Sequence, residues 1–98
     1  MLITNITHYL NPHGNIAKDM PEEAREFATF LTMIIEASSD FDSEMGYNTG
    51  IKCHQTNCQG TILSRLIIEE GHEIFWWCPV CQNEGIIAEW EGSKWDRS

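Results

Sequence analysis

The sequence predicts a small α+β fold in which a short N-terminal hairpin and one amphipathic helix pack on a three-stranded antiparallel sheet. A single stretch of the 98 residues has helical periodicity, and three later stretches are rich in β-branched and aromatic residues. Ninety-eight residues allow one domain of ordinary size. We expect it to comprise 1–38 (hairpin and helix), 39–50 (an acidic linker) and 51–98 (the sheet).

The N-terminal hairpin is predicted from a turn signal. Asn11-Pro12-His13-Gly14 places proline and glycine where a chain reverses direction. The turn separates 8–10 from 15–17, and these two short stretches are the expected strands of the hairpin.

The helix is predicted over residues 20–38. Pro21 suits the first turn of a helix, and Asp19 and Glu22 have the spacing of a capping box. Apolar residues then recur at intervals of three and four. They are Ala24, Phe27, Ala28, Leu31, Ile34 and Ile35. We expect this face to pack in the core, and the sequence leaves open whether it covers its own sheet or that of a second molecule.

The sheet is predicted from three apolar stretches that follow an acidic loop. The expected strands are residues 61–68, 73–77 and 85–91, with a hairpin turn at 69–72. The second strand reads EIFWW, so alternating side chains place large apolar groups on both faces of the sheet. A sheet this small needs a packing partner, which the helix can provide on one face.

Four cysteines in the second half form the most informative pattern of the chain. Four residues separate Cys53 from Cys58, two separate Cys78 from Cys81, and nineteen lie between the two pairs. Two close pairs joined by a hairpin-sized insert can bring four thiolates around one zinc ion. Gly60 and Gly85 follow the pairs at positions where such turns often use left-handed backbone. The sequence therefore predicts one Zn²⁺ per chain, held by these four cysteines.

The cysteine pattern is also compatible with chemistry other than zinc binding. Iron accepts four thiolates in tetrahedral geometry as well. A disulfide framework requires an oxidising compartment, and the beginning of the sequence, MLITNITHYL, does not resemble a secretory signal. Thiol exchange at Cys78 and Cys81, or a role in metal delivery, is a further alternative. His54 and His72 are potential substitute ligands, which we expect to be surface side chains because four cysteines already complete the coordination shell.

Composition and charge restrict the class of function. The formal charge is −9, which disfavours nucleic-acid partners because these usually require a basic surface. No apolar run approaches the roughly 20 residues that a transmembrane helix needs, so we expect a protein without membrane contact. The sequence contains no phosphate loop and no nucleophile–base pair, so we do not expect an enzyme.

Three stretches of the chain have a recognisable pattern: HYLNPHGNIAKDMPEEAREFATFLTMIIEAS, the cysteine pairs and the ending CPVCQNEGIIAEWEGSKWD. Together they resemble a group of small bacterial zinc-ribbon proteins of uncharacterised function. The ending matches the group's pattern at Cys78, Pro79, Cys81, Gly85, Ile87, Trp90, Gly92, Trp95 and Asp96. The resemblance implies a zinc-ribbon fold for 51–98 and a bacterial, cytoplasmic setting. It implies no activity.

The tryptophans give the remaining functional hypothesis. Trp76, Trp77, Trp90 and Trp95 either pack over a thin sheet or form an interaction surface, since tryptophan is enriched at binding hot spots. We therefore expect a structural zinc-binding protein that binds another protein or itself. The alternative is a nucleic-acid-binding zinc ribbon, in which tryptophans stack on single strands and which the negative charge disfavours.

Overall fold

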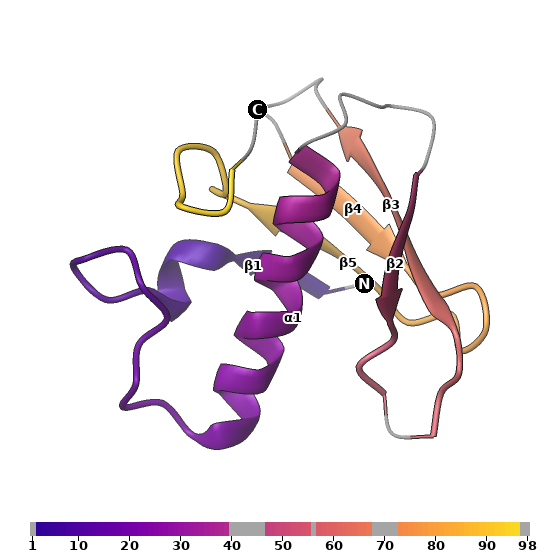
Figure 1. Ribbon diagram of the computed structural model, residues 1–98, viewed down its shortest axis with the longest axis horizontal. Coiled ribbons are helices and arrows are strands. Elements are labelled where there is room, and N and C mark those ends of the chain that lie inside the picture. Colours follow the sequence, from indigo (N-terminus) through magenta and orange to yellow (C-terminus); the bar gives the residue numbers. More distant parts are fainter. Residues whose placement is uncertain (1, 40–46, 56, 68–72, 97–98) are drawn as a thin grey trace.

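The computed structural model describes residues 2–39, 47–55, 57–67 and 73–96 and has one α-helix packed on a five-stranded mixed sheet (Figure 1). Along the chain the elements are β1 (Leu2–Asn5), the 3-10 helix η1 (Ile6–Tyr9), α1 (Glu22–Ser39), β2 (Tyr47–Lys52), β3 (Thr61–Ile67), β4 (Glu73–Trp77) and β5 (Glu84–Ala88). The predicted α+β class is confirmed. The prediction of a three-stranded, purely antiparallel sheet is wrong, because β1 and β2 also belong to the sheet.

The strands follow the order β1-β5-β4-β3-β2. Strands β2 to β5 form an antiparallel meander, and β1 is parallel to β5, with Leu2 opposite Gly85. β2 lies largely within residues 39–50, which the sequence analysis treats as a linker, and its Thr49 hydroxyl donates to the Ile62 carbonyl at 2.8 Å. Residues 40–46, the acidic part of that linker, lie outside the described residues.

The N-terminal hairpin is reduced to a single bridge between Leu10 and Ile16. The predicted turn is present, since the Gly14 amide donates to the Asn11 carbonyl at 2.9 Å. The Asn11 side chain also accepts from the amides of His13 and Asn15, at 2.9 and 3.1 Å. The Asn11 and Ala17 amides also donate to the Asn15 and Tyr9 carbonyls, at 2.8 and 2.9 Å, so the two sides of the turn pair as a very short hairpin.

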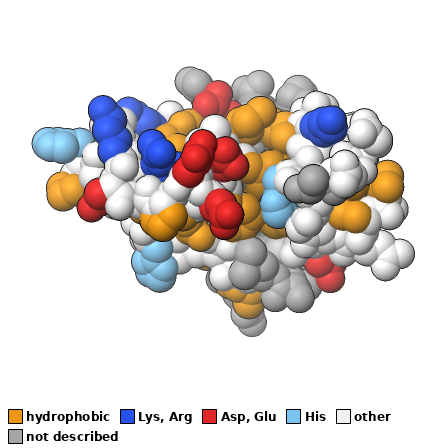
Figure 2. Space-filling view, turned by 90° about the horizontal axis from the view of Figure 1, so that it is seen from below, with side chains coloured by type: hydrophobic (Ala, Val, Ile, Leu, Met, Phe, Trp, Pro, Cys, Tyr) orange, Lys and Arg blue, Asp and Glu red, His pale blue; other side chains and the backbone are white. Residues whose placement is uncertain are grey.

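The helix prediction is confirmed to within two residues at each end. The Arg25 amide donates to the Pro21 carbonyl at 3.1 Å, so Pro21 lies at the N-cap and not in the first turn. Glu22 and Glu23 occupy the first turn, where carboxylates are favoured by the helix dipole. Figure 2 views the molecule from the end at which α1 begins and shows acidic side chains beside hydrophobic ones.

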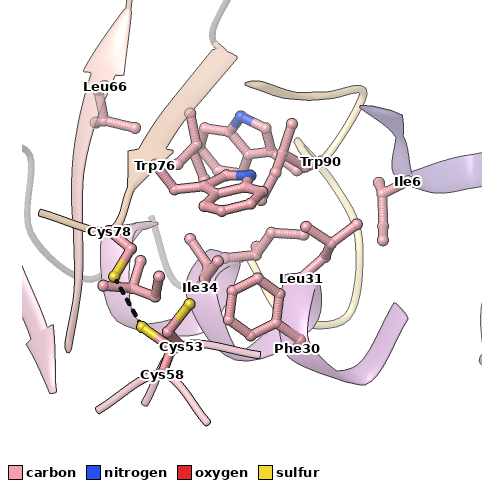
Figure 3. Packing of buried hydrophobic residues seen from close by; sticks show 14 residues of the cluster. Ile6, Phe30, Leu31, Ile34, Cys53, Cys58, Leu66, Trp76, Cys78 and Trp90 are labelled. Atoms are coloured by element: carbon pink, nitrogen blue, oxygen red, sulfur yellow. Dashed lines mark hydrogen bonds between the residues drawn. The ribbon is translucent and has the colours of Figure 1, made fainter. Parts of the chain in front are cut away.

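The core lies between α1 and one face of the sheet (Figure 3). The helix contacts β2, β3 and β4 of its own chain, so it covers its own sheet. Its fully buried residues meet the inward side chains of the strands. These residues are Ala28, Leu31, Ile34 and Ile35 on α1 and Ile62, Ile74, Trp76 and Ile87 on the sheet.

The strand boundaries agree with the prediction at β3 and β4 and differ at β5. Residues 73–77 form β4 as expected, while β5 ends at Ala88 and not at residue 91. Glu89 has φ 61°, a left-handed conformation that interrupts an extended strand. The turn predicted at 69–72 lies outside the described residues.

A buried pair of serines connects α1 to β3. The hydroxyl oxygens of Ser38 and Ser64 lie 2.6 Å apart, and both side chains are buried. We expect Ser64→Ala to lower the free energy of unfolding by about 1–3 kcal/mol, because it leaves the Ser38 hydroxyl without this partner. The double variant Ser38→Ala/Ser64→Ala is expected to recover much of that loss. Chemical denaturation of the wild type, Ser38→Ala, Ser64→Ala and the double variant measures both effects, and a double variant less stable than either single variant would contradict the interpretation.

Candidate metal centre

Two loops at the same end of the sheet carry the four cysteines (Figure 1). Cys53 and Cys58 lie in the β2–β3 connection, and Cys78 and Cys81 lie in the β4–β5 connection. β3 begins where its antiparallel neighbour β4 ends, since Leu63 pairs with Trp77. The register of these two central strands therefore brings the loops together.

The four sulfur atoms form a compact cluster. All four Sγ atoms lie within 4.8 Å of one another, and the Cys53–Cys81 and Cys58–Cys78 pairs are each separated by 3.6 Å. Tetrahedral zinc with Zn–S bonds of about 2.3 Å places its sulfurs about 3.8 Å apart. A disulfide requires about 2.05 Å. The spacing thus fits four ligands of one metal ion and does not fit two disulfides.

Backbone hydrogen bonds shape each cysteine loop. In the first loop, the Gly60 amide donates to Cys58 Sγ at 3.4 Å, and the Cys53 amide donates to the Gly60 carbonyl at 2.9 Å. In the second loop, the amides of Cys78 and Gln82 donate to the carbonyls of Asn83 and Cys78, each at 2.8 Å. These bonds hold the loops closed and direct the thiols toward one point.

The predicted left-handed glycines are not found at Gly60 and Gly85. Asn57 and Gln82 adopt the left-handed conformation instead, with φ of 68° and 64°. Asparagine tolerates this region better than most residues, and a glycine is therefore not required there. Gly60 has a different role, because a Cβ added to it would lie 2.4 Å from Cys78 Sγ.

We expect Gly60→Ala to weaken metal binding by at least about tenfold, a loss of the size seen when residues supporting a metal site are altered. The added methyl group would displace Cys78 Sγ or the Val80 side chain, which lies 3.0 Å from the same position. Competition with a chromophoric chelator measures the affinity. Gln59→Ala, at the exposed neighbouring position, is the matched control and should bind as the wild type does. Equal affinities of the two variants would show that the close approach is not needed.

Electrostatics distinguish the thiols from one another. Burial raises the pKa of the Cys53 thiol to about 12. Burial also opposes ionisation of Cys78, but hydrogen bonds from the amides of Cys81 and Val80, together with those from the Cys58 and Cys81 thiols, outweigh it and lower the pKa of Cys78 to about 7. Cys78 is therefore substantially ionised near neutral pH, whereas Cys53 must lose a proton when a metal binds. Affinity should accordingly fall as the pH is lowered.

Exposure of the cluster is uneven. Cys53, Cys58 and Cys78 are buried, and Cys81 is exposed. Cys81 borders an open pocket of about 630 Å³, whose lining residues also include Gln55, Asn57, Val80 and Gln82. Small reagents therefore reach the cluster from the side of Cys81.

His54 joins the two loops and the helix, a role that the sequence analysis missed. Its Nε2 lies 2.7 Å from the Asn83 side-chain nitrogen in the other loop. Its ring packs 4.6 Å from Phe30 on α1 and 5.9 Å from Trp76, measured between centroids. The His54 side chain is exposed, as expected from the sequence, but partial burial lowers its pKa and thereby favours the neutral ring, whose Nε2 can accept from the Asn83 amide. Its position beside Cys53 was the available signal. His72 lies outside the described residues.

The tryptophans divide between the core and the surface. Trp76 and Trp90 are only 1% and 3% exposed and lie together in the core (Figure 3), so they offer no interaction surface. Trp77 and Trp95 are partly exposed. Of the four residues named from the sequence as an interaction surface, these two reach the outside of the molecule.

No protein-family model, no curated protein and no solved structure matches this chain. Among the described residues, no helix is long and apolar enough to cross a bilayer. We therefore infer function from the fold and the cysteine cluster.

Proposed function

We propose that the protein is a structural zinc-binding module of the zinc-ribbon type, which acts by binding protein chains. The observation that carries this proposal is the convergence of four cysteine sulfurs within 4.8 Å at the ends of two neighbouring hairpins. Zinc ribbons hold their metal with cysteines from two such hairpin loops. A metal at this position connects two loops that a small hydrophobic core would otherwise hold only weakly.

Zinc supplies structure in this proposal and not chemistry. Four thiolates complete a tetrahedral shell, so no coordination position is left for a water molecule or a substrate. The protein's own contribution is to hold the sulfurs: Gly60 admits the close approach of Cys78, and His54 braces one loop against the other. A non-catalytic role, in which the folded surface binds a partner, agrees with this closed site.

Native mass spectrometry before and after treatment with a strong chelator tests the metal. We expect one zinc ion per chain before treatment and none afterwards, with a shift to the higher charge states of an unfolded chain. One iron per chain would replace zinc in the proposal. A metal-free protein with four freely reactive thiols would overturn the structural site and favour thiol redox chemistry.

A further inference from the structure

The sheet has a second face, opposite the one that α1 covers, which we call the open face. Side chains alternate along β3, β4 and β5 so that every second residue is buried under the helix and the others are not. The open face carries Ile3, Arg65, Glu73, Phe75, Trp77 and Ile86. None of the six is buried in the described structure, and Ile3 is 68% exposed.

The centre of the open face is apolar and continuous. Strand register aligns Ile3, Ile86, Phe75 and Arg65 in one row across four strands. Phe75 and Trp77 are stacked with centroids 5.3 Å apart, and the Arg65 guanidinium lies 5.5 Å from the Phe75 centroid. Exposed apolar and aromatic groups that form one patch mark an interaction site more often than scattered ones do.

The charges on the open face are complementary to one another when the face meets a second copy of itself. Two charged residues are neighbours of Phe75 on this face. Arg65 lies across the sheet from Phe75, about 4.8 Å away, and Glu73 lies along β4 from Phe75, about 6.7 Å away. Consider a twofold axis that runs parallel to the sheet surface over Phe75 and bisects these two directions. Rotation about it turns a second copy face to face with the first and exchanges the direction across the strands with the direction along them. It places Arg65 of each copy opposite Glu73 of the other, to within about 2 Å along the surface.

The same rotation matches the apolar groups. It stacks Phe75 on Phe75 at the axis and carries Trp77 over Ile86 of the second copy. The strands of the two sheets then cross at about 90°, which is one of the two preferred arrangements of packed sheets. The same rotation brings Glu84 near Glu84 of the second copy at the rim of the contact, where solvent screens the repulsion between the two carboxylates.

We propose that the open face is a homodimer interface in which two copies of this chain pack orthogonally about Phe75. This inference names the partner in the proposed function but does not depend on the metal. The flat area of five strands, each about five residues long, is roughly 400 Å² per copy, below the roughly 800 Å² per partner of a stable interface. An interface smaller than the standard size favours a weak dimer whose population depends on protein concentration.

Sedimentation equilibrium over about 1–500 µM protein, which brackets micromolar affinity, tests the interface with charge-reversal variants. Arg65→Glu and Glu73→Arg are each expected to weaken dimerisation by at least about tenfold, because like charges then face each other. The double variant Arg65→Glu/Glu73→Arg restores the opposite-charge pairing, and its dissociation constant should lie within about threefold of the wild-type value. Glu84→Gln should tighten the dimer slightly. Arg25→Glu, which reverses a charge on the exposed face of α1, should change nothing.

Several results would overturn the proposal. These are a monomeric wild type at all concentrations, a dimer that the single reversals do not weaken, and a double variant as weak as the singles. Binding of a single-stranded thymidine oligonucleotide, lost in Trp77→Ala, would assign the open face to nucleic acid instead. Metal content measured on the same samples separates the two proposals. A zinc-loaded monomer would refute only the dimer interface, and a metal-free dimer would refute only the zinc site.

Discussion

Replacing Cys78 with serine is expected to abolish metal binding and to unfold the strands that a bound metal would connect. Cys78 is fully buried, and its sulfur lies 3.6 Å from that of Cys58 in the other loop. A structural zinc ion contributes on the order of 10 kcal/mol to a small domain. The total stability of a domain is usually about 5–15 kcal/mol. The loss of one ligand thus removes an interaction comparable to the whole.

The measurement combines metal analysis with amide hydrogen exchange. Exchange protection should disappear from β2 to β5 in Cys78→Ser and remain in Val80→Ser, an exposed position in the same loop that serves as the control. A metal-free Cys78→Ser protein with the wild-type free energy of unfolding would show that the cluster does not hold the fold together.

Replacing Trp76 with alanine should have the second-largest effect. Trp76 is 1% exposed and packs edge-on against Phe30, with ring centroids 5.3 Å apart. Truncation of a buried tryptophan leaves a large cavity and costs about 3–5 kcal/mol. Because His54 also contacts Trp76, we expect the variant to bind metal less tightly as well.

Trp77→Ala is the matched control for this variant. Trp77 is the next residue of β4 and points to the other face of the sheet, where it is partly exposed. Compared by urea denaturation at low protein concentration, Trp77→Ala should lose no more than about half as much stability. Similar losses of stability in the two variants would contradict the conclusion that the main core lies on the face of the sheet that α1 covers.

Local patterns account for the elements that sequence analysis predicted. The helix was recognisable because apolar residues such as Leu31 and Ile34 recur with its period, and β4 because EIFWW is a dense apolar run. The cysteine cluster was recognisable because close pairs imply converging loops. In each case the signal lies within a short stretch of sequence.

The missed elements depend on partners that lie far away in the chain. β1 has four residues, and β2 contains asparagine and glycine, so neither shows a strand pattern of its own. Both become strands because β5 and β3 offer free edges. The roles of His54 and Gly60 were hidden for the same reason, since each is defined by contacts with the other cysteine loop.

The parallel pairing of β1 with β5 has a consequence for how the chain folds during its synthesis. Leu2 pairs with Gly85, 83 residues later. At about 5–20 residues per second, β1 waits roughly 4–17 s after its own translation before β5 exists. The helix and the β2–β3 hairpin can form in that interval, whereas the second cysteine pair and the docking strand arrive together. We therefore expect closure of the sheet by β1 to come last in folding, because it joins the strands that lie furthest apart in the chain.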